Sequence, residues 1–203
     1  MLNASLRDRV LELILQSQRR LRLALDHGAG VRIVVGHSDD VPPILRSLEP
    51  LSGVSVLPAD GGLLGGTSVA GHFALALGQH GTAQDEVRGA WEYRLLMAWQ
   101  MCGVGEAEAR RLGRALPQTL TQSERWLSGL VLQMLRPLDV LVVDRAFAQL
   151  SRREMTHVCG HLEAFRRFHP FRPLLLIDVD VPGLPELPWL RETVMWEEAT
   201  CLS

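Results

Sequence analysis

The sequence contains no lysine, and all 21 of its basic residues are arginine. A lysine ammonium is the usual cation on the β- and γ-phosphates in a nucleotide-binding phosphate loop, so no segment of this chain can form such a loop in its ordinary way. A general bias toward arginine explains the absence as well as a loss of phosphate chemistry does. In either case the ammonium group is missing from every site.

Cysteine, excess charge and long apolar runs are also scarce. The three cysteines, Cys102, Cys159 and Cys201, are widely spaced and form no CxxC pair. They therefore imply neither a zinc knuckle nor a disulfide framework, and a reduced cytosol is the simplest interpretation. The formal net charge is only -2 and no block of like charges occurs, so nothing points to nucleic acid. No apolar run approaches the roughly 20 residues of a membrane span, and the amino terminus is unlike a signal peptide. Any membrane contact is therefore expected to go through a partner.

The hydrophobic pattern predicts alternating strands and helices. Residues 10–16 and 21–26 predict a hairpin or the start of an antiparallel edge sheet, with a helix over residues 5–25 as the rival prediction. Further strands are expected at 31–36, at the start of the segment 54–69, at 139–144, at 172–180 and within 191–199. Helices are expected after the loop at 37–40, within 71–81, between 83 and 135 with turns over 101–117, and at 151–168. This order predicts one α/β domain, residues 1–203, with a mostly parallel sheet and a helical insertion at about 83–130.

Several short motifs follow one another along these elements. They are GHSDDVPPILRSL at 36–48, ADGGLLGGTSVAGHFALAL at 59–77, LTQSE at 120–124, DVLVVDR at 139–145, AQLS at 148–151 and LLLIDVD at 174–180. In this order they resemble the phosphate loop, Q-loop, signature, Walker B strand, D-loop and switch strand of an ABC-transporter nucleotide-binding domain. The resemblance covers nearly the whole chain. It implies an ABC-ATPase-like P-loop fold with an antiparallel edge sheet, a mostly parallel core sheet and a helical insertion.

The segment that resembles the phosphate loop departs most from the family. Gly36 is the one family glycine left, and Pro42 and Pro43 hold the positions of the lysine and the serine. Proline has no N–H, so two backbone donors are lost together with the ammonium group. Asp39 and Asp40 add negative charge, and each unit repulsion at about 4 Å costs roughly 1 to 4 kcal/mol. We expect a triphosphate to bind this loop poorly or not at all.

The remaining family positions that carry chemistry differ as well. Asp144 stands where the family has its magnesium-side aspartate, but Arg145 replaces the glutamate that polarises the attacking water, and a guanidinium cannot accept a proton. Ala59 stands at the Q-loop glutamine and Val179 near the switch histidine. Neither side chain can hold a metal ion, a water molecule or a phosphate by hydrogen bonds. The resemblance therefore implies the shape of an ATPase with little or no hydrolysis.

The signature-like segment, Leu120, Thr121, Gln122, Ser123 and Glu124, is partly preserved. Thr121 keeps a hydroxyl group. Gln122 and Ser123 replace the glycines that allow the backbone to approach a phosphate across a dimer. If a partner presents a nucleotide here, Thr121 and Ser123 are the residues expected nearest to it.

Several residues allow more than one interpretation. Arg145 could form an ion pair with Asp144, anchor a partner, or reach a nucleotide as a substitute cation, while Asp144 could simply cap the next loop. His157 and His161 have the i, i+4 spacing of metal ligands, but a packing or solvated role is favoured because Val158 stands where an HExxH motif has its glutamate. The large apolar residues of the insertion either form a groove for a coupling helix or fill the core; they are Trp91, Tyr93, Met97, Trp99 and Met101.

The function that the resemblance implies is that of a catalytically inactive ABC-ATPase-like subunit in the assembly, coupling or regulation of a membrane transporter. Its partners would be a membrane-embedded subunit and an intact ABC ATPase or a second copy of the chain, at the cytoplasmic face of a membrane, with no cofactor and no metal ion. Two alternatives stay open: a divergent hydrolase that uses Asp144 for Mg²⁺, and a soluble scaffold protein with the same fold.

Overall fold

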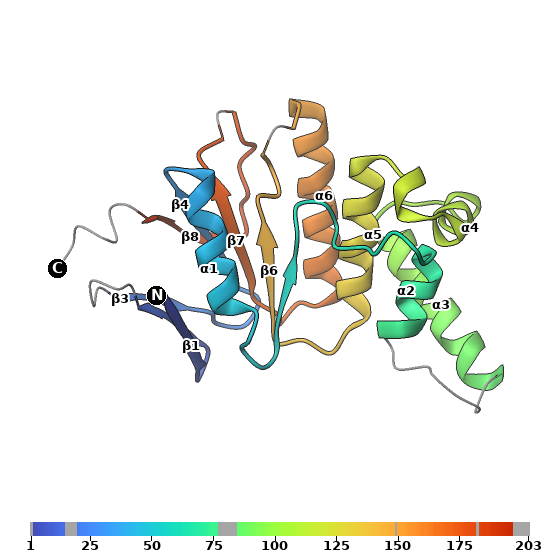
Figure 1. Cartoon of the computed structure of the whole chain (residues 1–203), viewed down its shortest axis with the longest axis horizontal. Helices are drawn as coiled ribbons and strands as arrows, with labels where there is room; N and C mark the ends of the chain where they lie inside the picture. Colours follow the sequence, from blue (N-terminus) through green and yellow to red (C-terminus); the bar gives the residue numbers. More distant parts are fainter. Residues whose placement is uncertain (1, 15–19, 77–84, 149, 182, 197–203) are drawn as a thin grey trace. The chain divides into compact units, whose positions relative to one another are not determined.

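The computed structural model divides into two compact units. It describes residues 2–14, 20–76, 85–148, 150–181 and 183–196. The first unit comprises residues 1–58, 138–159 and 169–203, and the second comprises residues 59–137 and 160–168. Figure 1 shows the path of the chain through both sets of elements.

The first unit begins with a three-stranded antiparallel sheet of β1 (Asn3–Arg7), β2 (Val10–Ile14) and β3 (Arg20–Ala24), in the order β1-β2-β3. In β3, buried leucines alternate with exposed residues, which is the period of a strand with one buried face. The predicted hairpin is therefore confirmed for its described residues, and the rival helix over residues 5–25 is wrong. Residues 15 and 16 lie outside the described residues. The sheet also gains β1, which the pattern did not predict.

The second sheet of this unit is parallel throughout, with the order β5-β6-β7-β4-β8. Its strands are β4 (Gly30–Val35), β5 (Val54–Leu57), β6 (Val140–Asp144), β7 (Leu174–Val179) and β8 (Leu190–Met195). Strands β4 and β6 are buried along their whole length and β7 is buried except at its last residue, as expected where both faces of a parallel sheet are covered. The predicted strands are confirmed, although residues 197–199 of the last segment lie outside the described residues.

Helix α1 (Val41–Leu48) follows the short 3-10 helix η1 (Ser38–Asp40). Its buried side chains, including Ile44 and Leu48, belong to one apolar core with the inward residues of β2, β3, β4, β6 and β7. The core lies between the two sheets and α1. The parallel pairing of β7 with both β4 and β6 places the carboxyl ends of these three strands side by side.

The second unit is helical. It contains α2 (Val69–Ala76), α3 (Asp85–Met101), α4 (Glu106–Arg114), the 3-10 helix η2 (Pro117–Thr119) and α5 (Gln122–Leu135). Helix α6 (Arg152–Phe168) runs from the first unit into the second. Trp99, Phe73 and Leu130 are buried in this unit. Residues 77–84, which include parts of the predicted helices at 71–81 and from 83, lie outside the described residues.

Residues 101–117, predicted to carry the turns between the helices, also contain a helix that the pattern did not predict, α4 (Glu106–Arg114). The segment is rich in charge, but the charges are spaced for a helix. Arg110 pairs with Glu106 four residues earlier and Arg111 with Glu108 three residues earlier, while Leu112 is buried. Such i, i+3 and i, i+4 pairs support a helix even where apolar periodicity is weak.

Candidate functional site

The carboxyl edge of the parallel sheet brings together three of the segments that the sequence singles out. The chain leaves β4 through Gly36, β6 ends at Asp144, and β7 ends at Val179. A cavity of about 470 Å³ opens at this edge, within the first unit, and its lining includes Ser38, Arg145, Val179 and Asp180. Parallel α/β sheets bind their ligands at this edge. This is therefore the candidate site.

The two residues at the end of β6 form an ion pair with each other. Arg145 Nε donates to Asp144 Oδ1 at 2.7 Å and Arg145 Nη2 donates to Oδ2 at 3.0 Å. The side chain of Asp144 is 6% exposed and that of Arg145 is 31% exposed. The hydrogen bond to Asp144 raises the pKa of Arg145 despite its partial burial. Of the interpretations left open by the sequence, the neighbouring ion pair is confirmed.

The backbone holds Arg145 in this position. Its φ is +43°, in the left-handed region that non-glycine residues rarely occupy, and its N–H donates to the carbonyl of Ile177 at 2.7 Å. Both carboxylate oxygens of Asp144 are thus committed to a cation in the same chain. A magnesium ion would have to displace the guanidinium before it could bind Asp144.

Asp178, near the end of β7, is a further charged residue of this edge that sequence reasoning missed. Its side chain is fully buried; Oδ2 accepts a hydrogen bond from the Phe147 N–H at 3.2 Å and Oδ1 from the Val179 N–H at 2.9 Å. Burial raises the pKa of Asp178 to about 6, and the charge of Arg32 partly opposes the rise. Asp178 therefore ties the loop after β6 to the end of β7.

The loop after β4 is short, and two of the N–H groups at its end are hydrogen-bonded within it. The Asp40 N–H donates to the His37 carbonyl at 3.1 Å and the Val41 N–H donates to the Ser38 carbonyl. The next two residues of α1 are Pro42 and Pro43, which have no N–H. Asp40 occupies the N-cap position of α1 without a side-chain capping bond. An N-cap side chain accepts a hydrogen bond from the N–H of the second or third helical residue, and here both of these residues are prolines. Asp39 lies in η1 and is exposed.

The signature-like residues lie at the start of α5, in the second unit. Thr121 is the N-cap, and its N–H and hydroxyl donate to Glu124 Oε2 at 2.7 and 2.9 Å, while the Glu124 N–H donates to the Thr121 hydroxyl at 3.2 Å. Arg111 pairs with the other carboxylate oxygen of Glu124. This capping box places a carboxylate of the chain itself where a helix N-terminus would otherwise attract an anion. Gln122 and Ser123 form the first turn of the helix.

Ala59 begins the second unit, in the turn that leads to the glycine-rich loop GGLLGG at residues 61–66. The loop is attached to α2 by His72, which sequence reasoning also missed. His72 Nε2 accepts a hydrogen bond from the Leu64 N–H at 2.7 Å, so Nδ1 is the protonated nitrogen that donates to the Ser68 carbonyl at 2.9 Å. The side chain of Leu64 itself is 69% exposed.

The other candidate residues are placed as follows. His157 and His161 both lie on α6, and in the described part of the chain no group of three or more His, Cys, Asp or Glu residues could hold a metal ion. Gln149 of the D-loop-like AQLS and Cys201 lie outside the described residues. Trp99 is buried, whereas Tyr93 is 64% exposed and Met97 is 37% exposed.

Comparison with solved structures identifies the fold. The dimeric structure of MJ0796, a bacterial ABC transporter cassette, matches with a TM-score of 0.65 at 9% identity over 96% of this chain and 90% of that chain. The structure of cbiO1 from Clostridium perfringens, part of the ABC transporter complex cbiONQ, matches with a TM-score of 0.65 at 12% identity over 96% of this chain and 83% of that chain. No protein-family model and no curated protein matches the sequence.

The chain therefore has the fold of an ABC-transporter ATP-binding cassette. The predicted α/β fold, with its antiparallel sheet and parallel sheet, is confirmed. Among the described residues, no helix has both the length and the apolar character that a membrane span requires.

Proposed function

We propose that this chain is a catalytically inactive cassette-fold subunit of a membrane transporter complex. The observation that carries the proposal is the bidentate ion pair between Asp144 and Arg145. Arg145 is hydrogen-bonded to both carboxylate oxygens of Asp144, the Walker B-like residue. Arg145 is also a cation at the position where the family has a general base. A cation of this pKa cannot activate water.

The loop after β4 supports the same proposal. Phosphate groups bind helix N-termini through free backbone N–H groups. Here the first N–H of α1 is bonded to Ser38 and the next two residues are prolines. The two aspartates of η1 would repel a triphosphate. A conventional nucleotide complex would therefore lack its cation, the backbone donors of the first turn of α1 and its metal ligand together.

The capping box at α5 argues against a contact between Thr121 and a nucleotide held by a partner. The hydroxyl group of Thr121 is already hydrogen-bonded to Glu124, and the Glu124 carboxylate would face the incoming phosphates. We therefore propose that the subunit contacts its partners without a shared nucleotide. This is narrower than the role that the sequence motifs imply.

We place the contact with a membrane-embedded partner on the second unit. Tyr93 and Met97 are four residues apart on α3, so they share one face of the helix, and both are exposed. Exposed apolar side chains of this kind suit the helix-in-groove mode of recognition. The similar structure cbiO1 is part of the ABC transporter complex cbiONQ, which supports a membrane partner and a location at the cytoplasmic face of a membrane.

Copurification from solubilised membranes tests the proposal. We expect the native protein to carry a membrane-embedded subunit, with or without an intact ATPase, and the variant Tyr93→Ser/Met97→Ser to lose it. Arg94→Ser, at an exposed neighbouring position of α3, is the matched control and should retain the partner. Recovery of neither a membrane subunit nor an ATPase would favour the soluble scaffold instead.

A further inference from the structure

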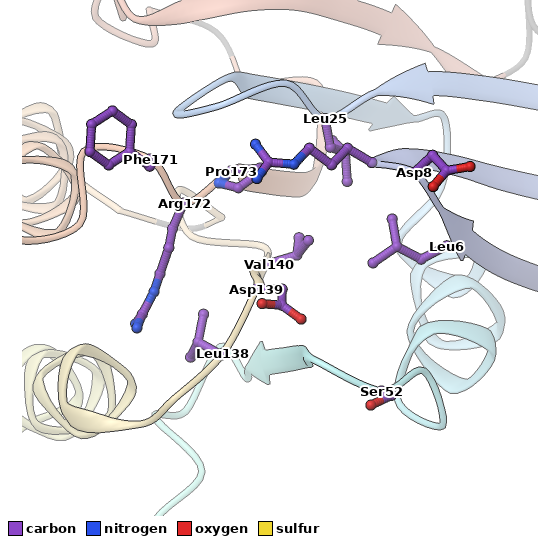
Figure 2. Close-up of a pocket in the computed structure, with 11 residues that line it drawn as sticks. Leu6, Asp8, Leu25, Ser52, Leu138, Asp139, Val140, Phe171, Arg172 and Pro173 are labelled. Carbon is purple, nitrogen blue, oxygen red and sulfur yellow. The ribbon is translucent and has the colours of Figure 1, made fainter.

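A second cavity, of about 520 Å³, lies in the first unit at the amino ends of β5, β6 and β7. It is therefore at the opposite edge of the parallel sheet from Asp144. Figure 2 shows the side chains that line it, which come from β1 and the turn after it, from Leu25 after β3, and from the segments at the start of the three strands. Its volume is within the range of about 300 to 1,000 Å³ that is typical of small-molecule sites.

Arg9 lines this cavity from a backbone conformation that is unfavourable for arginine. Asp8 and Arg9 form the two-residue turn between β1 and β2, with φ values of +47° and +63°. Turns of this type favour Asn or Asp followed by glycine, because both residues need positive φ. The Arg9 carbonyl accepts a hydrogen bond from the Leu25 N–H at 2.7 Å, which fixes the turn. Arg9 stands at the turn position that favours glycine, so it lowers the stability of the turn. Its side chain places a guanidinium group at the cavity.

Asp139, which precedes β6, supplies a carboxylate to the same cavity. Its N–H donates to the Gly53 carbonyl at 2.7 Å. Gly53 has a φ of +76°, and a Cβ atom there would overlap with Asp139 Oδ2. Figure 2 shows Asp139 among the lining side chains, between Leu138 and Val140 along the chain, with its carboxylate facing the space that they enclose. The local backbone thus holds this carboxylate at the cavity.

Four charged residues line this cavity: Asp8, Arg9, Asp139 and Arg172. Arg172 Nη1 is hydrogen-bonded to His169 Nε2 at 3.0 Å, and the negative charge of Asp139 opposes the lowering of the Arg172 pKa by burial. Within the described part of the chain, no ion pair of 4.0 Å or less involves Arg9 or Asp139. Between them the cavity presents apolar side chains, including Leu25, Val140 and Pro173, and Phe171 stands 70% exposed among the lining residues. A ligand that complements two carboxylates, two guanidinium groups and this apolar surface carries both a cationic and an anionic group together with an apolar group.

We propose that this cavity binds a small zwitterion of the α-amino acid class, with its ammonium group on Asp139 and its carboxylate on Arg9. The apolar surface and Phe171 favour an apolar or aromatic ligand side chain. Guanidinium groups bind carboxylates well. The proposal does not depend on the role of Asp144 or on any membrane partner.

Titration of the whole purified chain with L-phenylalanine, phenethylamine and 3-phenylpropionate tests this proposal. We expect saturable calorimetric binding of phenylalanine, and at least roughly tenfold weaker binding of each analogue that lacks one charge. Asp139→Asn should weaken the binding of phenylalanine by about tenfold and leave that of 3-phenylpropionate unchanged.

Arg9→Gly separates loss of binding from loss of folding. Glycine fits the positive φ, so this variant should melt at a higher temperature than the native chain and yet bind phenylalanine at least about tenfold more weakly. The proposal is overturned if none of the standard amino acids binds the native chain at about 10 mM, or if Arg9→Gly binds phenylalanine as tightly as the native chain does. Neither result bears on the copurification experiment.

Discussion

The two edges of the parallel sheet treat their charged residues in opposite ways. At the carboxyl edge, Asp144 is paired with Arg145 and Asp178 accepts two backbone N–H groups. At the amino edge, Arg9 and Asp139 stand at a cavity without an ion pair between described residues. A cavity at the expected edge of an α/β sheet is therefore not enough to make a ligand-binding site. What counts is whether its charges are still available to a ligand.

The largest effect should come from the most buried charge of the carboxyl edge. Asp178→Ala leaves the Phe147 and Val179 N–H groups without their acceptor and Arg32 without its neighbouring charge. We expect a loss of about 3 kcal/mol in the free energy of unfolding, measured by urea denaturation. Asp180→Ala, at an exposed position of the same edge, is the control and should change it by less than about 0.5 kcal/mol. Equal effects of the two variants would contradict the structural role of Asp178.

Removal of the cation from the Asp144 pair should have the next largest effect. Arg145→Ala leaves a nearly buried carboxylate unpaired, which we expect to cost about 2 kcal/mol, less than for a fully buried pair because Arg145 is partly exposed. Denaturation of Arg152→Ala, an exposed arginine at the start of α6, gives the comparison. If both variants unfold at the same denaturant concentration, the pair contributes nothing to the fold.

The dependence of stability on pH should report Asp178 as well. Its pKa in the folded protein, about 6, lies above the ordinary value of 3.8, so the folded state favours the protonated form. Its contribution to stability is therefore complete below the ordinary value and is lost as the pH rises through about 6. From pH 7.5 down to pH 5 we expect a gain of about 1 kcal/mol relative to Asp178→Asn. A native chain and variant with parallel pH profiles would show that Asp178 ionises normally.

The smallest effect is expected at the amino edge. Asp139→Asn removes an exposed charge that has no ion pair in the described structure, so the free energy of unfolding should change by less than about 0.5 kcal/mol. Thermal denaturation checks this. A loss above about 1 kcal/mol would mean that Asp139 holds the fold together, and the contrast between the two edges would disappear.

The sequence predicts most elements because their apolar patterns are local. Strands β4, β6 and β7 are unbroken apolar runs, and the capped start of α5 is visible in LTQSE. Two elements escaped prediction for physical reasons: α4 is stabilised by ion pairs on a charge-rich surface, and β1 has no buried residue among its five.

The sequence predicts a contact within the site only where the interacting residues are neighbours in the chain. Asp144 and Arg145 are neighbours, so their pairing could be foreseen. Asp178 bonds to Phe147 across 31 positions, and the one available signal was a carboxylate inside the buried run LLLIDV. The amino-edge cavity is assembled from segments between Leu6 and Pro173, and no local pattern could place them together.

Calorimetric titration of the purified native chain with Mg·ATP tests the central claim most directly. With Arg145 on Asp144 and no free donors at the start of α1, we predict no saturable binding below about 1 mM, and no hydrolysis above that of Asp144→Ala. Saturable, magnesium-dependent binding or turnover that disappears in Asp144→Ala would contradict the account and identify a divergent hydrolase.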